Sequence, residues 1–266
     1  MLRHEALQLL LSGVPADVWD RHWPATHTRM LRQACKALRQ LVDGLLLPKA
    51  MRLPTAVRVS KRWWLSYSAV HGPAKWLFLM QQLAPIAASA NITVLDLRCG
   101  SKLDGLHPVL QVCPHLHSFS LQSNGNLGPA GTALLAQALQ PCTGVTHLRL
   151  RRNDMGLTGL HALAPTLASL LQLRLLDVGS NALGNRGVEA LAGLFDFLTG
   201  LATLNLSGNA MQPDGATTLA LSVSRLSRLT HLDIASNEIM NAGCTALAYA
   251  LAHCSHLRCL DLQNNR

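Results

Sequence analysis

The sequence predicts an α/β solenoid, in which parallel strands line a concave face and helices cover a convex face, preceded by a small helical segment. Two periodic markers and the composition support this prediction. From Ile92 an apolar-x-x-apolar-x-apolar-x-x-Asn pattern recurs, and from Asn153 each step is 28 residues. A glycine keeps the same period at positions 131, 159, 187, 215 and 243. The 266 residues are 49% hydrophobic and only 4% aromatic and 14% charged, which indicates an aliphatic core and excludes disorder for most of the chain.

Each repeat reads as a strand, an asparagine turn and a helix. We number each repeat from the first apolar residue of this pattern as position 1. Apolar residues at repeat positions 4 and 6 alternate with polar ones, which is typical of a strand with one buried face. After each periodic glycine, apolar residues such as Leu163, Leu167 and Leu170 form a helical stripe. The position-9 amide can satisfy backbone groups that a buried turn would leave unpaired. We therefore expect a structural ladder of Asn124, Asn153, Asn181, Asn209, Asn237 and Asn265.

Stacking of these units gives the predicted shape. Neighbouring strands are about 4.8 Å apart whereas packed helices need about 10 Å, so the stack must curve with its strands inside. Over residues 91–266 the pattern resembles the ribonuclease-inhibitor type of leucine-rich repeat. That resemblance implies a protein partner on the concave face. It leaves open two other roles: activation of a small GTPase, or a sensor domain from a larger immune-receptor-like protein.

The two ends of the repeat array depart from the pattern. The first unit has Gly100 in place of Asn and is short, as expected for an entry repeat. The sequence stops at Arg266, directly after Asn265, without a polar capping helix. We therefore expect a terminal strand with an exposed edge, and a fragment or a longer natural chain.

Residues 1–90 form a second, basic segment. They carry 12 Lys/Arg against 4 Asp/Glu, a net charge of +8, whereas residues 91–266 carry 11 against 10. Such a charge favours an acidic partner. The segment is similar to an F-box, although Val14 replaces the family's leucine and Leu38 its aromatic residue. The resemblance implies docking of an acidic adaptor of a cullin-type ubiquitin ligase through Val14, Pro15, Leu31, Cys35 and Leu38. The alternative is a helical cap on the first repeat.

The inner strand face carries the candidate partner-binding residues. Position 5 of the repeats places four aspartates in a row, Asp96, Asp177, Asp233 and Asp261. A basic group interrupts this row, formed by Arg149, Arg151, Arg152 and Arg174. This mixed-sign surface favours protein over nucleic acid. The alternative is an ordinary solvated strand face. The predicted binding residues are Asp96, Arg98, Arg149, Arg151, Arg152, Asp177, Asn205, His231, Asp233 and Asp261.

Other chemistry has little support in the sequence. The segment Lys61–Trp64 mixes cations with aromatic residues and could stack bases, but a helix with buried tryptophans is the preferred interpretation. Cys113, His115 and His117 could supply metal ligands, but Leu116 between them is a core position. No nucleophile, phosphate-loop or zinc-protease motif occurs. We expect no enzyme activity, cofactor, metal, nucleic acid or membrane span. The seven cysteines show no CxxC spacing, which favours a cytoplasmic protein, or alternatively a nuclear one.

Overall fold

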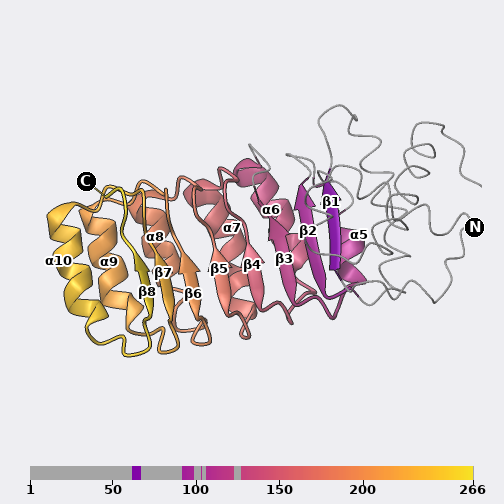
Figure 1. The fold of residues 1–266 in the computed structure, drawn as a ribbon. Coiled ribbons are helices and arrows are strands. Elements are labelled where there is room, and N and C mark those ends of the chain that lie inside the picture. Colours follow the sequence, from indigo (N-terminus) through magenta and orange to yellow (C-terminus); the bar gives the residue numbers. More distant parts are fainter. Residues whose placement is uncertain (1–61, 67–91, 99–102, 104–105, 123–126, 266) are drawn as a thin grey trace, which may run out of the picture.

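One parallel sheet organises the chain. The computed structural model describes residues 62–66, 92–98, 103, 106–122 and 127–265. Within them, eight strands follow one another across the sheet in sequence order (Figure 1). The strands are β1 (Arg62–Ser66), β2 (Val94–Arg98), β3 (Ser118–Leu121), β4 (His147–Arg149), β5 (Leu175–Asp177), β6 (Thr203–Asn205), β7 (His231–Asp233) and β8 (Cys259–Asp261).

The helices lie together on one face of this sheet (Figure 1). Each follows a strand and returns the chain to the start of the next, as parallel pairing requires. The helices are α5 (Leu106–Gln111), α6 (Gly128–Leu139), α7 (Gly156–Ser169), α8 (Gly184–Ala192), α9 (Pro213–Val223) and α10 (Met240–Leu251). The predicted α/β solenoid is confirmed.

The strand register follows the repeat period. Leu148 pairs with Leu176, Leu176 with Leu204 and Leu204 with Leu232, so each partner is 28 residues further along the chain. Like-numbered side chains therefore lie in rows across the sheet. Side chains at position 5 share one row on the face that the described helices leave uncovered (Figure 1).

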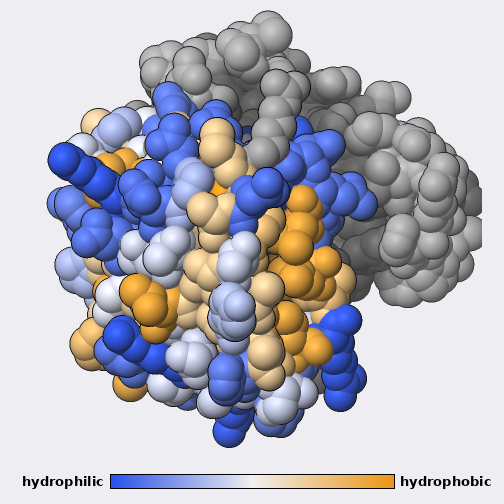
Figure 2. Space-filling model, turned by 90° about the vertical axis from the view of Figure 1, so that its left-hand side faces the viewer, coloured by the Kyte–Doolittle hydropathy of each residue, from blue (hydrophilic) through white to orange (hydrophobic). Residues whose placement is uncertain are grey.

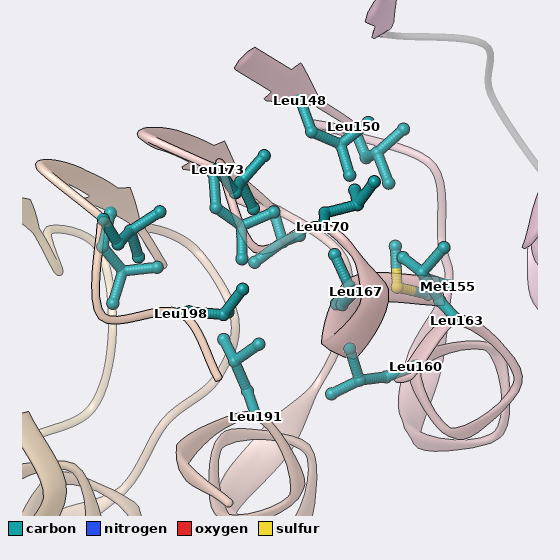
Figure 3. Close-up of a cluster of buried hydrophobic side chains, with 14 of the residues drawn as sticks. Leu148, Leu150, Met155, Leu160, Leu163, Leu167, Leu170, Leu173, Leu191 and Leu198 are labelled. Carbon is teal, nitrogen blue, oxygen red and sulfur yellow. The ribbon is translucent and has the colours of Figure 1, made fainter. Parts of the chain in front are cut away.

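A continuous aliphatic core fills the space between strands and helices. Leu148 on β4 and Leu150 just after it point toward the helix residues Leu163 and Leu167, and all four are fully buried (Figure 3). Leu170, which directly follows α7, is buried in the same cluster (Figure 3). The apolar stripe predicted from the sequence is thus the surface of the helix that contacts the sheet.

The periodic glycines allow neighbouring helices to approach closely. A Cβ on Gly243 would lie 2.7 Å from the Cβ of Ala216 on α9 and 2.6 Å from Ile239 Cγ2. A Cβ on Gly159 would similarly lie 3.1 Å from the Cβ of Thr132 on α6. Both distances are shorter than ordinary carbon contacts, so the helix spacing requires glycine at these two positions.

The sheet extends upstream of residue 91. Arg62–Ser66 form β1, which pairs in parallel with β2. The helix preferred for this segment from the sequence is therefore wrong over these residues. Tryptophan has a high strand propensity, and the pairing satisfies backbone groups of β2 that would otherwise form a free edge.

The last described repeat leaves core positions open. Leu260 and Leu262 are 40% and 37% exposed, whereas the equivalent Leu204 and Leu206 are fully buried. Figure 2 looks onto this end of the molecule and shows a band of apolar side chains there. Within the described part of the chain, no helix is long and apolar enough to cross a bilayer.

Candidate functional site: the uncovered strand face

The turns that follow β4 to β8 are each held by an asparagine. The side-chain amide of Asn209 donates to Leu206 O at 2.9 Å in its own repeat and to Val178 O at 3.1 Å in the preceding one. Its Oδ1 accepts the backbone N–H of Asn181 at 2.9 Å. Each asparagine thus closes its own turn and fastens it to the previous repeat.

The same arrangement recurs along the array. Asn181 Oδ1 accepts the N–H of Asn153 at 3.0 Å, and Asn237 Oδ1 accepts that of Asn209 at 2.9 Å. Asn265 donates to Ile234 O at 3.0 Å. The asparagines therefore lie in adjacent rungs. Asn124 lies outside the described residues.

The residue before each asparagine adopts a left-handed backbone. Its φ is 59° at Arg152, 55° at Ser180, 67° at Gly208 and 54° at Ser236. Glycine adopts this conformation without steric strain, whereas other residues do so at a cost of roughly 1–2 kcal/mol. This turn ends the strand and directs the chain toward the helix layer.

The position-5 side chains have a local structural role. Oδ1 of Asp177 accepts the N–H of Gly179 at 3.1 Å, and Asn205 makes the same bond to Ser207 at 2.9 Å. The two further aspartates of this row behave alike, with N···O distances of 3.1 Å for Asp233 and 3.0 Å for Asp261. One side-chain oxygen is therefore used within the fold. For the aspartates, this leaves the second carboxylate oxygen as the group that a partner could reach.

The four arginines predicted from the sequence lie on neighbouring rungs. We call Arg149, Arg151, Arg152 and Arg174 the arginine cluster. Arg152 and Arg174 are exposed, and Arg149 and Arg151 are partly exposed. Arg149 is in register with Asp177, yet the one ion pair between described residues joins Arg225 and Asp196 elsewhere, at 3.3 Å.

Electrostatic effects tie this cluster to its neighbours. Burial, followed by the charges of Arg149 and Arg174, lowers the pKa of His147. Burial raises the pKa of Asp177, although the Gly179 N–H and the positive charges of Arg151 and Arg149 oppose that shift. The arginines are thus close enough to act on both side chains without forming a direct ion pair.

Two histidines at position 3 share one arrangement. Nδ1 of His147 lies 2.8 Å from the hydroxyl of Thr146, and Nδ1 of His231 lies 2.8 Å from that of Thr230. Each threonine hydroxyl donates to a backbone carbonyl, which leaves its oxygen to accept from the ring. His231 was predicted from the sequence and His147 was not, although both occupy position 3 of their repeats.

Several predicted residues cannot be placed as a site. The adaptor-docking residues Val14, Pro15, Leu31, Cys35 and Leu38 lie outside the described residues. Arg98 ends β2, but its side chain is not described. Asp96 is partly buried on the same strand.

The buried cysteines belong to the core. Cys113 and Cys142 are at most 1% exposed, and burial raises their pKa to about 11 and about 12, so both thiols are protonated at neutral pH. Among the described residues, no group of three His, Cys, Asp or Glu side chains is arranged to hold a metal ion.

Comparison with known proteins identifies the repeat. The family described as Leucine Rich repeat matches residues 142–164, 172–192, 201–220, 227–248 and 253–266. No curated protein matches the chain.

Two solved structures are similar at low identity. A Bacteroides fragilis protein is 14% identical with a TM-score of 0.46, and the match covers 77% of this chain and 64% of that protein, so the chain spans less than two thirds of its length. A Listeria monocytogenes internalin is 16% identical with a TM-score of 0.25, and the match covers 68% of this chain and 77% of that one. The sheet register, the asparagine turns and the family match together show that the chain folds as an α/β leucine-rich-repeat solenoid.

Proposed function

We propose that this chain is a non-enzymatic scaffold that binds a protein partner on the uncovered face of its sheet. Leucine-rich repeats are generally protein–protein interaction modules. The observation that carries the proposal is the row of polar position-5 side chains on a face that no described helix covers (Figure 1). A rigid sheet that holds side chains in fixed rows suits recognition, because little conformational entropy is lost on binding.

The charges on this face favour a protein over a nucleic acid. Phosphate backbones need an extended positive surface. Here the arginine cluster is followed along the sheet by Asp177, the neutral Asn205, Asp233 and Asp261. The aspartates would repel a nucleic acid that continued along the sheet, whereas a face with both signs of charge can match the mixed charges of a protein surface.

A matched pair of bulky substitutions tests the proposal. Thr203 lies on β6 in the middle of the uncovered face, whereas Thr217 is exposed on α9 on the opposite side. Proteins captured by the full chain should be lost with Thr203→Trp and retained with Thr217→Trp, as quantified by isotope-labelled mass spectrometry. Equal capture by both variants would show that the partner does not use the sheet face.

We further propose that residues 1–90 link this scaffold to a cullin-type ubiquitin ligase, so that the bound partner is presented for ubiquitination. The F-box-like residues and the net charge of +8 support this role, because the adaptor that such segments bind is acidic. The full chain should recover that adaptor in a pull-down, and Leu31→Asp should abolish the recovery. A pull-down that yields no adaptor where known F-box proteins do would refute this part.

A further inference from the structure

The arginine cluster concentrates positive charge that the described fold does not neutralise. None of its four guanidinium groups makes an ion pair or a hydrogen bond to another described residue. Two carboxylates are near in sequence or register. Asp177, whose Oδ1 is held by the Gly179 N–H, lies on the next rung, and Asp154 is exposed in the turn. The four cations therefore exceed the two adjacent anions.

The equivalent positions of sister repeats show that the fold does not require these charges. The β4 repeat reads Leu-Arg-Leu-Arg-Arg-Asn over residues 148–153, and the β6 repeat reads Leu-Asn-Leu-Ser-Gly-Asn over residues 204–209. Both sequences form the same strand and the same asparagine turn. Arg152 even occupies the left-handed position that Gly208 fills without strain. The charge of these arginines is therefore not needed for the strand or the turn, which indicates a role outside the fold.

We propose that the arginine cluster anchors a carboxylate-rich segment of the protein partner. This inference rests on the proposed scaffold function and specifies the chemistry of the partner. Guanidinium groups bind carboxylates through paired, charge-assisted hydrogen bonds. Arg149 ends β4 and Arg151 follows it by two residues, and Arg174 directly precedes β5. Because neighbouring rungs are only about 4.8 Å apart, one partner segment that crosses the strands can contact arginines from both rungs.

The rest of the face argues that the ligand is an acidic peptide and not a nucleic acid. Asp177 borders the cluster, and Asp233 and Asp261 follow on β7 and β8. A polyphosphate that continued along the sheet would meet these carboxylates, whereas a peptide can confine its acidic residues to the cluster.

A variant that copies the sister repeat provides the test. Arg149→Asn, Arg151→Ser and Arg152→Gly convert residues 148–153 into the sequence of residues 204–209. The control triple variant, Arg186→Gln with Arg225→Gln and Arg228→Gln, removes the same charge from exposed positions outside the cluster. The probe is a fluorescein-labelled peptide of twelve alternating Glu and Ser residues, measured by fluorescence anisotropy at low salt with the full chain. The unlabelled acidic peptide and a twelve-nucleotide thymidine strand serve as competitors.

The outcomes separate this inference from the proposed function. The acidic peptide should bind the parent and the control with similar Kd, and at least tenfold more weakly to the sister-repeat variant. An equal Kd for both triple variants, or displacement by the thymidine strand at lower concentration than by unlabelled acidic peptide, would overturn the inference. If Thr203→Trp still abolishes partner capture in that case, the scaffold function stands and only the assignment to the cluster fails. Circular dichroism melts of both variants verify that they are folded.

Discussion

Replacing Asn209 with alanine should destabilise the solenoid more than any change on the exposed strand face. Asn209 is fully buried, and its Oδ1 accepts the N–H groups of Asn181 at 2.9 Å and Leu183 at 3.4 Å. Both donors lie in a buried turn that water does not reach. Val178 O loses the Asn209 amide but still accepts a hydrogen bond from the side-chain amide of Asn181. The principal loss is therefore that of the acceptor for the two backbone N–H groups. At about 1–3 kcal/mol for each stranded group, with the longer bond counted at the lower end, we expect a loss of about 2–4 kcal/mol.

Asp233 provides the control on the neighbouring strand β7. It is partly exposed, and its Oδ1 accepts the N–H of Ala235, which is itself partly exposed, so solvent can replace this bond. Asp233→Ala should therefore reduce the free energy of unfolding by about 0.5 kcal/mol. Urea denaturation followed by circular dichroism measures both changes, and hydrogen exchange should show faster exchange at Asn181 and Leu183 only for Asn209→Ala. Equal losses in the two variants, or unchanged exchange at these amides, would refute the reasoning.

Three further predictions concern other parts of the molecule. Burial raises the pKa of Asp177, so its carboxyl stabilises the fold when protonated, and this contribution is lost as the pH rises through the folded pKa. The stability of Asp177→Asn relative to the parent should therefore be about 0.5 kcal/mol higher at pH 7 than at pH 3, as measured by thermal melts at the two pH values. Gly243→Ala should cost about 1–3 kcal/mol in urea denaturation, because its Cβ would lie 2.7 Å from that of Ala216. Iodoacetamide at pH 8 should modify exposed Cys259 but not Cys142, whose pKa burial raises to about 12, until the chain unfolds; early modification of Cys142 by peptide mass spectrometry would contradict this burial.

The repeat architecture could be predicted because it depends on spacing alone. A fixed period places like-numbered residues in register, so the pairing of Leu176 with Leu204 follows from the sequence. The position-9 asparagines and the periodic glycines were equally visible, since a buried turn needs an amide and a close helix contact needs the absence of a Cβ. Strand β1 was not predicted, because its residues do not follow the repeat pattern and its strand state depends on pairing with β2.

The candidate site was predictable only in part. The repeat positions placed Arg149 and Asp177 on adjacent rungs, as the structure has them. The sequence could not show that these two side chains form no ion pair, because this depends on side-chain torsions that the period does not determine. Nor could it show that Asp177 Oδ1 is taken up by the Gly179 N–H, since position 5 alone does not distinguish a solvated carboxylate from one that closes a local turn.

The asparagine ladder makes the solenoid directional. The backbone N–H groups of Asn153, Asn181 and Asn209 each find their acceptor on the asparagine of the next repeat, so these three turns are completed by the repeat that follows them. The series ends at Asn265, whose Oδ1 has no hydrogen-bond partner among the described residues. Cooperativity is therefore transmitted from the C-terminal neighbour toward the N-terminal one. Fraying of the rung that holds Asn237 removes the acceptor of the Asn209 N–H, so unfolding should advance from there toward the N-terminal repeats.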